Sequence, residues 1–274
     1  MEKEELKKEY EEGKLVSFSD NFYEMKILSE ESDLFTQITS HIKDTTTEIQ
    51  KNDNSESYVL DLGGGKGNYG VYATKILKAK KLIVYDVSES LINLGKSLYG
   101  DSVEYVQAKF EEVFEKEKSR TFCYIFVKEA IHFSNKDFYY KLLNFCMTNL
   151  KGKLCVVGIP RLANWIETPP YPPSALTALN NLTLDVVDCF EIAKKELIAE
   201  ESEKKVSNIN LVYKNINYNT PFDEFSTLLL NRRWSFFTKC SDEELQSHLE
   251  KLKEKNSSLV EYNCTQGCFD CEFK

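Results

Sequence analysis

The stretch Tyr58-Val-Leu-Asp-Leu-Gly-Gly-Gly-Lys-Gly67 decides the fold of this chain. It begins as a short apolar run, which is typical of a parallel strand buried on both faces. It ends in a loop that holds four of the eleven glycines of the sequence. Glycine lets a backbone approach a ligand closely, and a helix that follows such a loop offers unpaired N–H donors. The stretch therefore predicts a strand that ends in a ligand-binding loop.

Apolar runs and amphipathic stretches alternate after this loop. We expect further strands at 82–85, 103–106, 124–127 and 154–158, and helices at 68–78, 88–99 and 135–150. Asn135 is expected to cap the third helix, and Gly100 to end the second. This alternation predicts a doubly wound α/β sheet with right-handed crossovers. All six prolines fall within 160–221, and around them we expect a strand at 205–218, helices at 222–230 and 242–253, and a last strand or hairpin at 258–273.

Composition narrows the class of protein. The chain has 274 residues, of which 42% are hydrophobic and 29% are charged, as in an ordinary globular protein. It has no apolar run of the length that a membrane-spanning helix needs, and its first residues are charged where a signal peptide would be apolar. A net charge of -9 disfavours nucleic acid and anionic membranes as partners. We predict a cytoplasmic protein with a small-molecule substrate.

Eight cysteines are scattered through the sequence, and without a secretory signal they are expected to be reduced and mostly buried. Three of them, Cys264, Cys268 and Cys271, have the C-x3-C-x2-C spacing of an iron–sulfur motif. In radical enzymes that motif follows an early strand, whereas here it lies near the last residue. We therefore interpret the spacing as a coincidence and predict no metal site.

Three kinds of ligand-binding glycine loop are possible for the stretch at 58–67 and the residues after it. A P-loop needs a hydroxyl residue after its lysine, but Gly67 follows Lys66. A dinucleotide loop fits Gly65-Lys-Gly-Asn-Tyr-Gly70, with Asp86 near the spacing expected of a ribose-binding acid. The third pattern is a strand-end acid followed by G-x-G-x-G, which Asp61-Leu-Gly-Gly-Gly-Lys-Gly67 fits without a gap. In the helix expected at 135–150, Tyr139 and Tyr140 lack a lysine four positions later, so no Tyr-x-x-x-Lys pair there supports an oxidoreductase, although that alternative remains open.

Over about 55–160 the chain resembles class I S-adenosylmethionine-dependent methyltransferases of the small-molecule type. The resemblance implies a Rossmann-like, mostly parallel seven-stranded sheet with an antiparallel last strand, an N-terminal segment and a helical lid insertion. It also implies S-adenosyl-L-methionine as the cofactor and S-adenosyl-L-homocysteine as its product.

The same resemblance assigns the donor site. Gly63, Gly65 and Asp61 would bind the amino-acid part of the donor. Asp86 would accept hydrogen bonds from the ribose hydroxyls, and Val87 would pack on the adenine. Where the family has an adenine-binding Asp, this sequence has Lys109, so backbone groups of 108–110 would take that role. The remaining expected donor contacts are Gly64, Gly67, Phe110, Lys128 and Tyr23.

The acceptor site is expected beside the donor. His132 follows the fourth strand and has the intrinsic pKa of a general base at neutral pH. Two aromatic segments without a role in the sheet suit a partly apolar pocket, and they contribute Phe22, Trp165 and Tyr171. The segment Arg232, Arg233 and Trp234 would add polar contacts.

We predict one methyltransferase domain over 1–274. Its parts are a helical lid segment at 1–50, a donor-binding core at 55–160, a substrate lid at 161–240, and a helix and last strand at 241–274. The predicted function is methyl transfer to a nitrogen, oxygen or sulfur atom of a small, partly apolar acceptor. A protein acceptor and a nicotinamide-dependent oxidoreductase are the alternatives, and the oligomeric state stays open.

Overall fold

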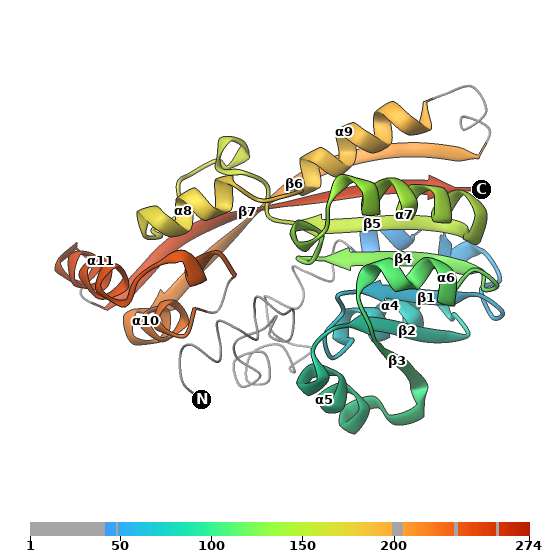
Figure 1. The fold of residues 1–274 in the computed structure, drawn as a ribbon, viewed down its shortest axis with the longest axis horizontal. Coiled ribbons are helices and arrows are strands. Elements are labelled where there is room, and N and C mark those ends of the chain that lie inside the picture. The colour runs from blue at the N-terminus through green and yellow to red at the C-terminus, as the bar shows by residue number, and fades with distance from the viewer. Residues whose placement is uncertain (1–41, 48, 199–204, 233–234, 256–257) are drawn as a thin grey trace. The chain divides into compact units, whose positions relative to one another are not determined.

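The computed structural model describes residues 42–47, 49–198, 205–232, 235–255 and 258–274. They form a seven-stranded sheet with the order β3-β2-β1-β4-β5-β7-β6 (Figure 1). The strands are β1 Tyr58–Leu62, β2 Lys81–Asp86, β3 Val103–Gln107, β4 Phe122–Lys128, β5 Leu150–Gly158, β6 Val206–Pro221 and β7 Leu259–Phe273. The fold class predicted from the sequence is confirmed.

The strands β1 to β5 are parallel, and β7 runs antiparallel to β5. The strand order reverses between β1 and β4, because β2 and β3 lie on one side of β1 and the later strands lie on the other. Ligands of open α/β sheets bind outside the carboxyl ends of the strands at such a switch point. The glycine loop follows the carboxyl end of β1 and therefore lies at this point.

The helices expected at 68–78, 88–99, 135–150, 222–230 and 242–253 are all present, within a few residues of the expected bounds. The helices of the sheet and of the later segments are α4 Asn68–Leu77, α5 Glu89–Tyr99, α6 Val113–Lys116, α7 Lys136–Asn149, α8 Pro173–Asn180, α9 Val186–Leu197, α10 Phe222–Leu230 and α11 Asp242–Lys255. The Asn135 side chain accepts a hydrogen bond from the backbone N–H of Phe138, which confirms the predicted cap of α7. The short helix α6 and the preceding turn Phe110–Glu112 were not predicted, because their few residues show no periodicity.

The described residues fall into two compact units. The sheet unit contains residues 42–159, 183–212 and 267–274, and the smaller unit contains 160–182 and 213–266. The strands β6 and β7 each contribute residues to both units. Among the residues that the structure describes, no helix is both long and apolar enough to cross a membrane.

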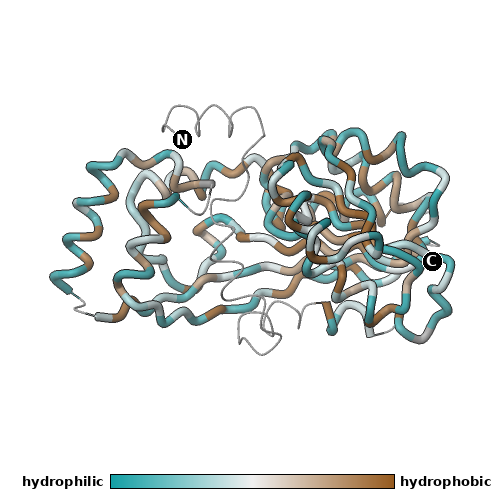
Figure 2. The backbone as a smooth tube through the Cα atoms, turned by 90° about the horizontal axis from the view of Figure 1, so that it is seen from below, coloured by the Kyte–Doolittle hydropathy of each residue, from teal (hydrophilic) through white to brown (hydrophobic). Residues whose placement is uncertain are grey.

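Two hydrophobic clusters cover the two faces of the sheet unit. One contains the inward residues of α6, α7 and α9, including Leu142 and Cys189, together with one set of strand residues. The other contains Ala73 and Leu77 of α4 with the alternate strand residues. Figure 2 shows hydrophobic stretches alternating with hydrophilic ones along the chain. The sheet is therefore buried on both faces, which explains the continuous apolar runs.

Candidate active site

The glycine loop after β1 has a backbone that only glycine adopts easily. Gly63 has φ 70°, and both its N–H and that of Gly64 point to the Tyr85 carbonyl at the end of β2. A Cβ atom on Gly63 would lie 2.5 Å from the Cβ of Ala130, and one on Gly64 would lie 2.5 Å from the Cγ of Asp61. No side chain fits at either position, so the loop keeps its backbone exposed at the strand ends.

Asp86 joins this loop to the end of β2. Its Oδ2 accepts a hydrogen bond of 2.8 Å from the Gly65 N–H, and its Oδ1 accepts one of 2.8 Å from the Ser88 N–H. The residue is only 4% exposed, and burial raises the pKa of its carboxyl. An ionised carboxylate can accept about four hydrogen bonds. Because these two backbone donors leave capacity for others, Asp86 is suited to bind a pair of hydroxyl groups such as those of a ribose.

Asp61 lies directly beneath the loop and is 2% exposed. Burial, followed by the nearby charge of Asp86, raises the pKa of Asp61 to about 7. The backbone N–H of Gly70 and the charge of Lys128 act in the opposite direction. A buried carboxyl whose pKa is near neutrality can gain or lose its proton in response to a charged ligand.

Lys128 is the last residue of β4, and Glu129 follows it. The Lys128 Nζ lies 3.0 Å from the Glu129 Oε2 and 5.0 Å from the centre of the Tyr69 ring. Glu129 has φ 51°, a conformation uncommon for a residue with a side chain, and its N–H donates to the Val157 carbonyl at 2.6 Å. Sequence reasoning did not single out Glu129 or Tyr69, although both lie next to predicted elements.

His132 lies in the 3-10 turn Ile131–Phe133, where its ring centre is 4.0 Å from that of Phe133. Burial lowers the pKa of His132 to about 4, and the charge of Glu129 opposes this effect. The imidazole is therefore neutral at physiological pH, which a general base requires, but its low basicity suits only acceptors that lose their proton readily.

The expected adenine contacts lie after β2 and β3. Val87 is half-buried, whereas the Lys109 side chain is exposed. The Lys109 N–H donates to the Glu112 carboxylate at 3.2 Å, and the Ala108 N–H donates to the Asp86 carbonyl at 3.1 Å. Both N–H groups thus have partners within the protein. The Phe110 ring packs on that of Phe138, with centres 5.4 Å apart, and beside Gly63.

The described acceptor candidates belong to the smaller unit. Trp165 donates its Nε1–H to the Pro160 carbonyl at 2.7 Å and packs edge-on against Tyr171. Tyr171 is 4% exposed and contacts further rings, namely Phe236, Phe237 and Tyr262. The structure thus uses both side chains in packing.

Arg232 is paired with Asp242 and donates to the Cys240 carbonyl, so it fixes the start of α11. Four other candidates lie outside the described residues: Phe22, Tyr23, Arg233 and Trp234.

The cysteine triplet lies on β7, where Cys268 and Cys271 face opposite sides of the sheet and enter different hydrophobic clusters. Side chains on opposite faces of a strand cannot bind one cluster. Within the described ranges, no group of His, Cys, Asp or Glu is arranged to hold a metal ion.

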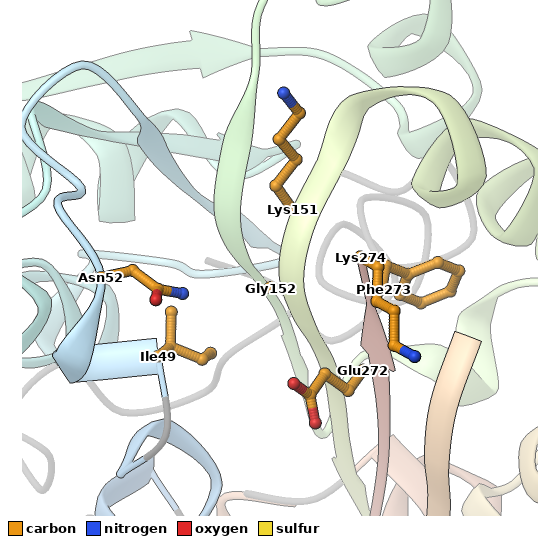
Figure 3. Close-up of a pocket in the computed structure, with 7 residues that line it drawn as sticks. All are labelled: Ile49, Asn52, Lys151, Gly152, Glu272, Phe273 and Lys274. Carbon is orange, nitrogen blue, oxygen red and sulfur yellow. The ribbon is translucent and has the colours of Figure 1, made fainter. Parts of the chain in front are cut away.

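A cavity of about 220 Å³ lies at the opposite end of the sheet (Figure 3). It is bordered by the start of β5, the end of the antiparallel β7 and the turn before β1, and its lining is Ile49, Asn52, Lys151, Gly152, Glu272, Phe273 and Lys274. It therefore lies away from the glycine loop and Asp86.

The fold and this site define a class of protein. A doubly wound sheet presents a glycine loop and two buried acids, Asp61 and Asp86, at its switch point, and the antiparallel β7 is inserted beside β5. This is the class I arrangement of S-adenosylmethionine-dependent methyltransferases, as the sequence pattern predicts.

A comparison with known protein families agrees with this assignment. Residues 59–152 match the family described as "Methyltransferase domain", so the segment from β1 to the start of β5 belongs to that family. The chain therefore carries a methyltransferase domain over these residues. No curated protein sequence matches it.

Solved structures of methyltransferases match the chain at low similarity. A protein of Bacillus halodurans C-125 assigned to the methyltransferases has a TM-score of 0.49 and 13% identity, and the match covers 84% of this chain and 98% of the other. The plantazolicin methyltransferase BpumL, solved with S-adenosylhomocysteine, has a TM-score of 0.47 and 13% identity over 99% of this chain and 98% of the other. A Haemonchus contortus N-methyltransferase has a TM-score of 0.46 and 16% identity over 87% of this chain and 52% of the other. These likenesses are too weak to carry an argument about substrates.

Proposed function

We propose that this protein transfers a methyl group from S-adenosylmethionine to a nitrogen, oxygen or sulfur atom of a small, partly apolar acceptor. The observation that carries the proposal is the bond between the Asp86 carboxylate and the Gly65 N–H. It joins the ribose-type acid to the glycine loop, so the two expected contacts of the donor lie side by side at one edge of the sheet.

The charged side chains at the ends of β1, β2 and β4 fit the chemical groups of the donor. S-adenosylmethionine carries two hydroxyls on its ribose, a cationic amino group and a cationic sulfonium. Asp86 has acceptor capacity for the hydroxyls, and Asp61 can supply a negative charge for a cation once it loses its proton. Lys128, whose side chain is 8% exposed, is a positive charge at the end of β4 that could bind the donor's carboxylate.

When bound, the donor supplies a methyl group that a nucleophile can displace without further activation. The protein therefore contributes mainly alignment of donor and acceptor. Asp61, Asp86 and the loop would fix the donor at the ends of β1 and β2. Glu129 and the neutral His132 would face the reacting side, where His132 accepts a proton from an acceptor that still carries one.

The net charge of -9 supports a small acceptor over a nucleic acid, because an acidic surface repels phosphate backbones. We extend the proposal to a cytoplasmic protein whose acceptor is enclosed by the segments at 1–50 and 161–240. Each segment contains aromatic residues, Phe22 and Tyr23 in the first and Trp165 and Tyr171 in the second, which suits a partly apolar substrate.

Titration calorimetry with S-adenosylhomocysteine, S-adenosylmethionine and NADH in parallel tests the donor. Binding of the two sulfur compounds without NADH is the expected result. Binding of NADH alone would favour the oxidoreductase alternative. Limited proteolysis then tests the lid, because a bound small acceptor should protect sites within 15–30 and 161–180.

A further inference from the structure

The glycine loop is held from two sides. At its entry, the end of β2 binds the N–H groups of Gly63 and Gly65. At its exit, two tyrosine hydroxyls from outside the loop make the contacts. Tyr105 of β3 donates to the Lys66 carbonyl at 2.8 Å, and Tyr99 of α5 donates to the Asn68 Oδ1 at 2.7 Å. Figure 1 shows α5 beside β3 at this edge of the sheet.

The space for the Tyr105 hydroxyl depends on α5. A Cβ atom on Gly95 would lie 2.4 Å from the Tyr105 hydroxyl oxygen and 2.8 Å from the Lys66 carbonyl oxygen. Glycine inside a helix costs about 0.5–1 kcal/mol relative to alanine. Since Gly95 is buried in the middle of α5, this cost is offset by the close approach of α5 to the loop that it permits.

Both hydroxyls keep their protons at neutral pH. Burial raises the pKa of Tyr99 and of Tyr105, so both remain O–H donors over the physiological range. Four glycines give this loop many alternative conformations, and a ligand that fits only one of them must wait for that conformation to be populated. The two tyrosine hydrogen bonds at the end of the loop therefore lower the population of loop conformations that cannot bind the ligand.

We propose that Tyr105, whose hydroxyl is given room by Gly95, and Tyr99 are positioning residues that hold the glycine loop in its donor-binding conformation. The proposal rests on the donor assignment made above, although the loop restraint itself can be measured without any ligand. Neither tyrosine needs to touch the donor, because both act through the backbone and side chain of the loop exit.

The test compares Tyr105→Phe and Tyr99→Phe with the wild type. Affinity is measured by calorimetry with S-adenosylhomocysteine, and loop order by hydrogen exchange of the amides at 63–68 in the ligand-free protein. Each variant should bind about threefold to tenfold more weakly, in line with the loss of one ordinary hydrogen bond. Amide exchange at 63–68 should be faster in both variants.

The matched control is Tyr124→Phe. It removes a similar buried hydroxyl bond, between Tyr124 of β4 and the Thr45 hydroxyl at 2.9 Å, away from the loop. This variant should lose stability to urea but keep both the affinity and the exchange pattern. A merely structural role for Tyr105 would make its variant behave like this control.

The proposal is overturned if Tyr105→Phe and Tyr99→Phe fold, bind within about twofold of the wild type and show unchanged exchange. If Tyr105→Phe does not fold, Tyr99→Phe decides alone, since it removes only one part-buried contact. Gly95→Ala keeps both hydroxyls and should reproduce the loss of affinity seen in Tyr105→Phe, because its Cβ would displace the Tyr105 hydroxyl. A wild type that binds no S-adenosylhomocysteine refutes the donor assignment, whereas the exchange comparison still decides the loop restraint.

Discussion

Replacement of Asp61 by asparagine should make the protein more stable at neutral pH, and the gain should depend on pH. In the folded state, burial and the charge of Asp86 raise the pKa of Asp61 from 3.8 to about 7. The folded protein therefore holds this proton more tightly than the unfolded chain does. That contribution to stability is complete below about pH 4 and is lost as the pH rises through 7.

The size of this change in stability follows from the pKa shift of Asp61. Each pKa unit corresponds to about 1.36 kcal/mol, so a change from 3.8 to about 7 is at most on the order of 4 kcal/mol. An asparagine at this position is neutral at every pH and avoids this loss. Its altered hydrogen bond with the Gly70 N–H adds an offset that does not vary with pH.

The assay is urea unfolding of wild type and Asp61→Asn at several pH values between 4.5 and 8. The difference in unfolding free energy between the two proteins should shift in favour of the variant by about 2–4 kcal/mol across this range. Asp101→Asn, at an exposed position, is the control and should show no such trend. A difference that stays constant within about 0.5 kcal/mol would refute the reasoning.

Three further predictions use the same assays. Asp86→Ala should weaken S-adenosylhomocysteine binding by about 1.5–3 kcal/mol, because hydrogen bonds to a charged group are lost, and unchanged calorimetric affinity would contradict its ribose role. Lys128→Met should move the pH midpoint of the Asp61 effect upward, because the ammonium lowers the pKa of that carboxyl; a midpoint that stays or falls would argue against the coupling. Gly152→Ala should destabilise the fold by about 1–3 kcal/mol or more, because its Cβ would lie 1.9 Å from the Cys123 carbonyl oxygen. Gly100→Ala is the control, because its Cβ meets nothing within 4 Å, and it should lose only the about 1–2 kcal/mol of stability that backbone strain costs. Equal losses of stability in the two variants would show that the contact with the Cys123 carbonyl is unimportant.

The sequence alone determined the sheet and the donor loop. Continuous apolar runs such as the one at Tyr58–Leu62 occur because both faces of the sheet are buried, and that pattern is visible without a structure. The glycines after β1 mark a backbone that must pass close to its neighbours, and their spacing to Asp86 is a property of one local strand–helix–strand unit. The side-chain roles assigned by resemblance remain predictions.

Only the tertiary structure decided which distant groups meet. Tyr105 and Gly95 reach the loop because β3 and α5 pack beside it, and nothing in their local sequence indicates this contact. Arg232 and Tyr171 were expected in an acceptor pocket, but the fold pairs one with Asp242 and packs the other among aromatic rings. The backbone of Glu129 at φ 51° is likewise held by a carbonyl of the neighbouring strand. Local periodicity encodes which face of an element is buried, whereas contacts between segments far apart in the chain depend on how those faces pack.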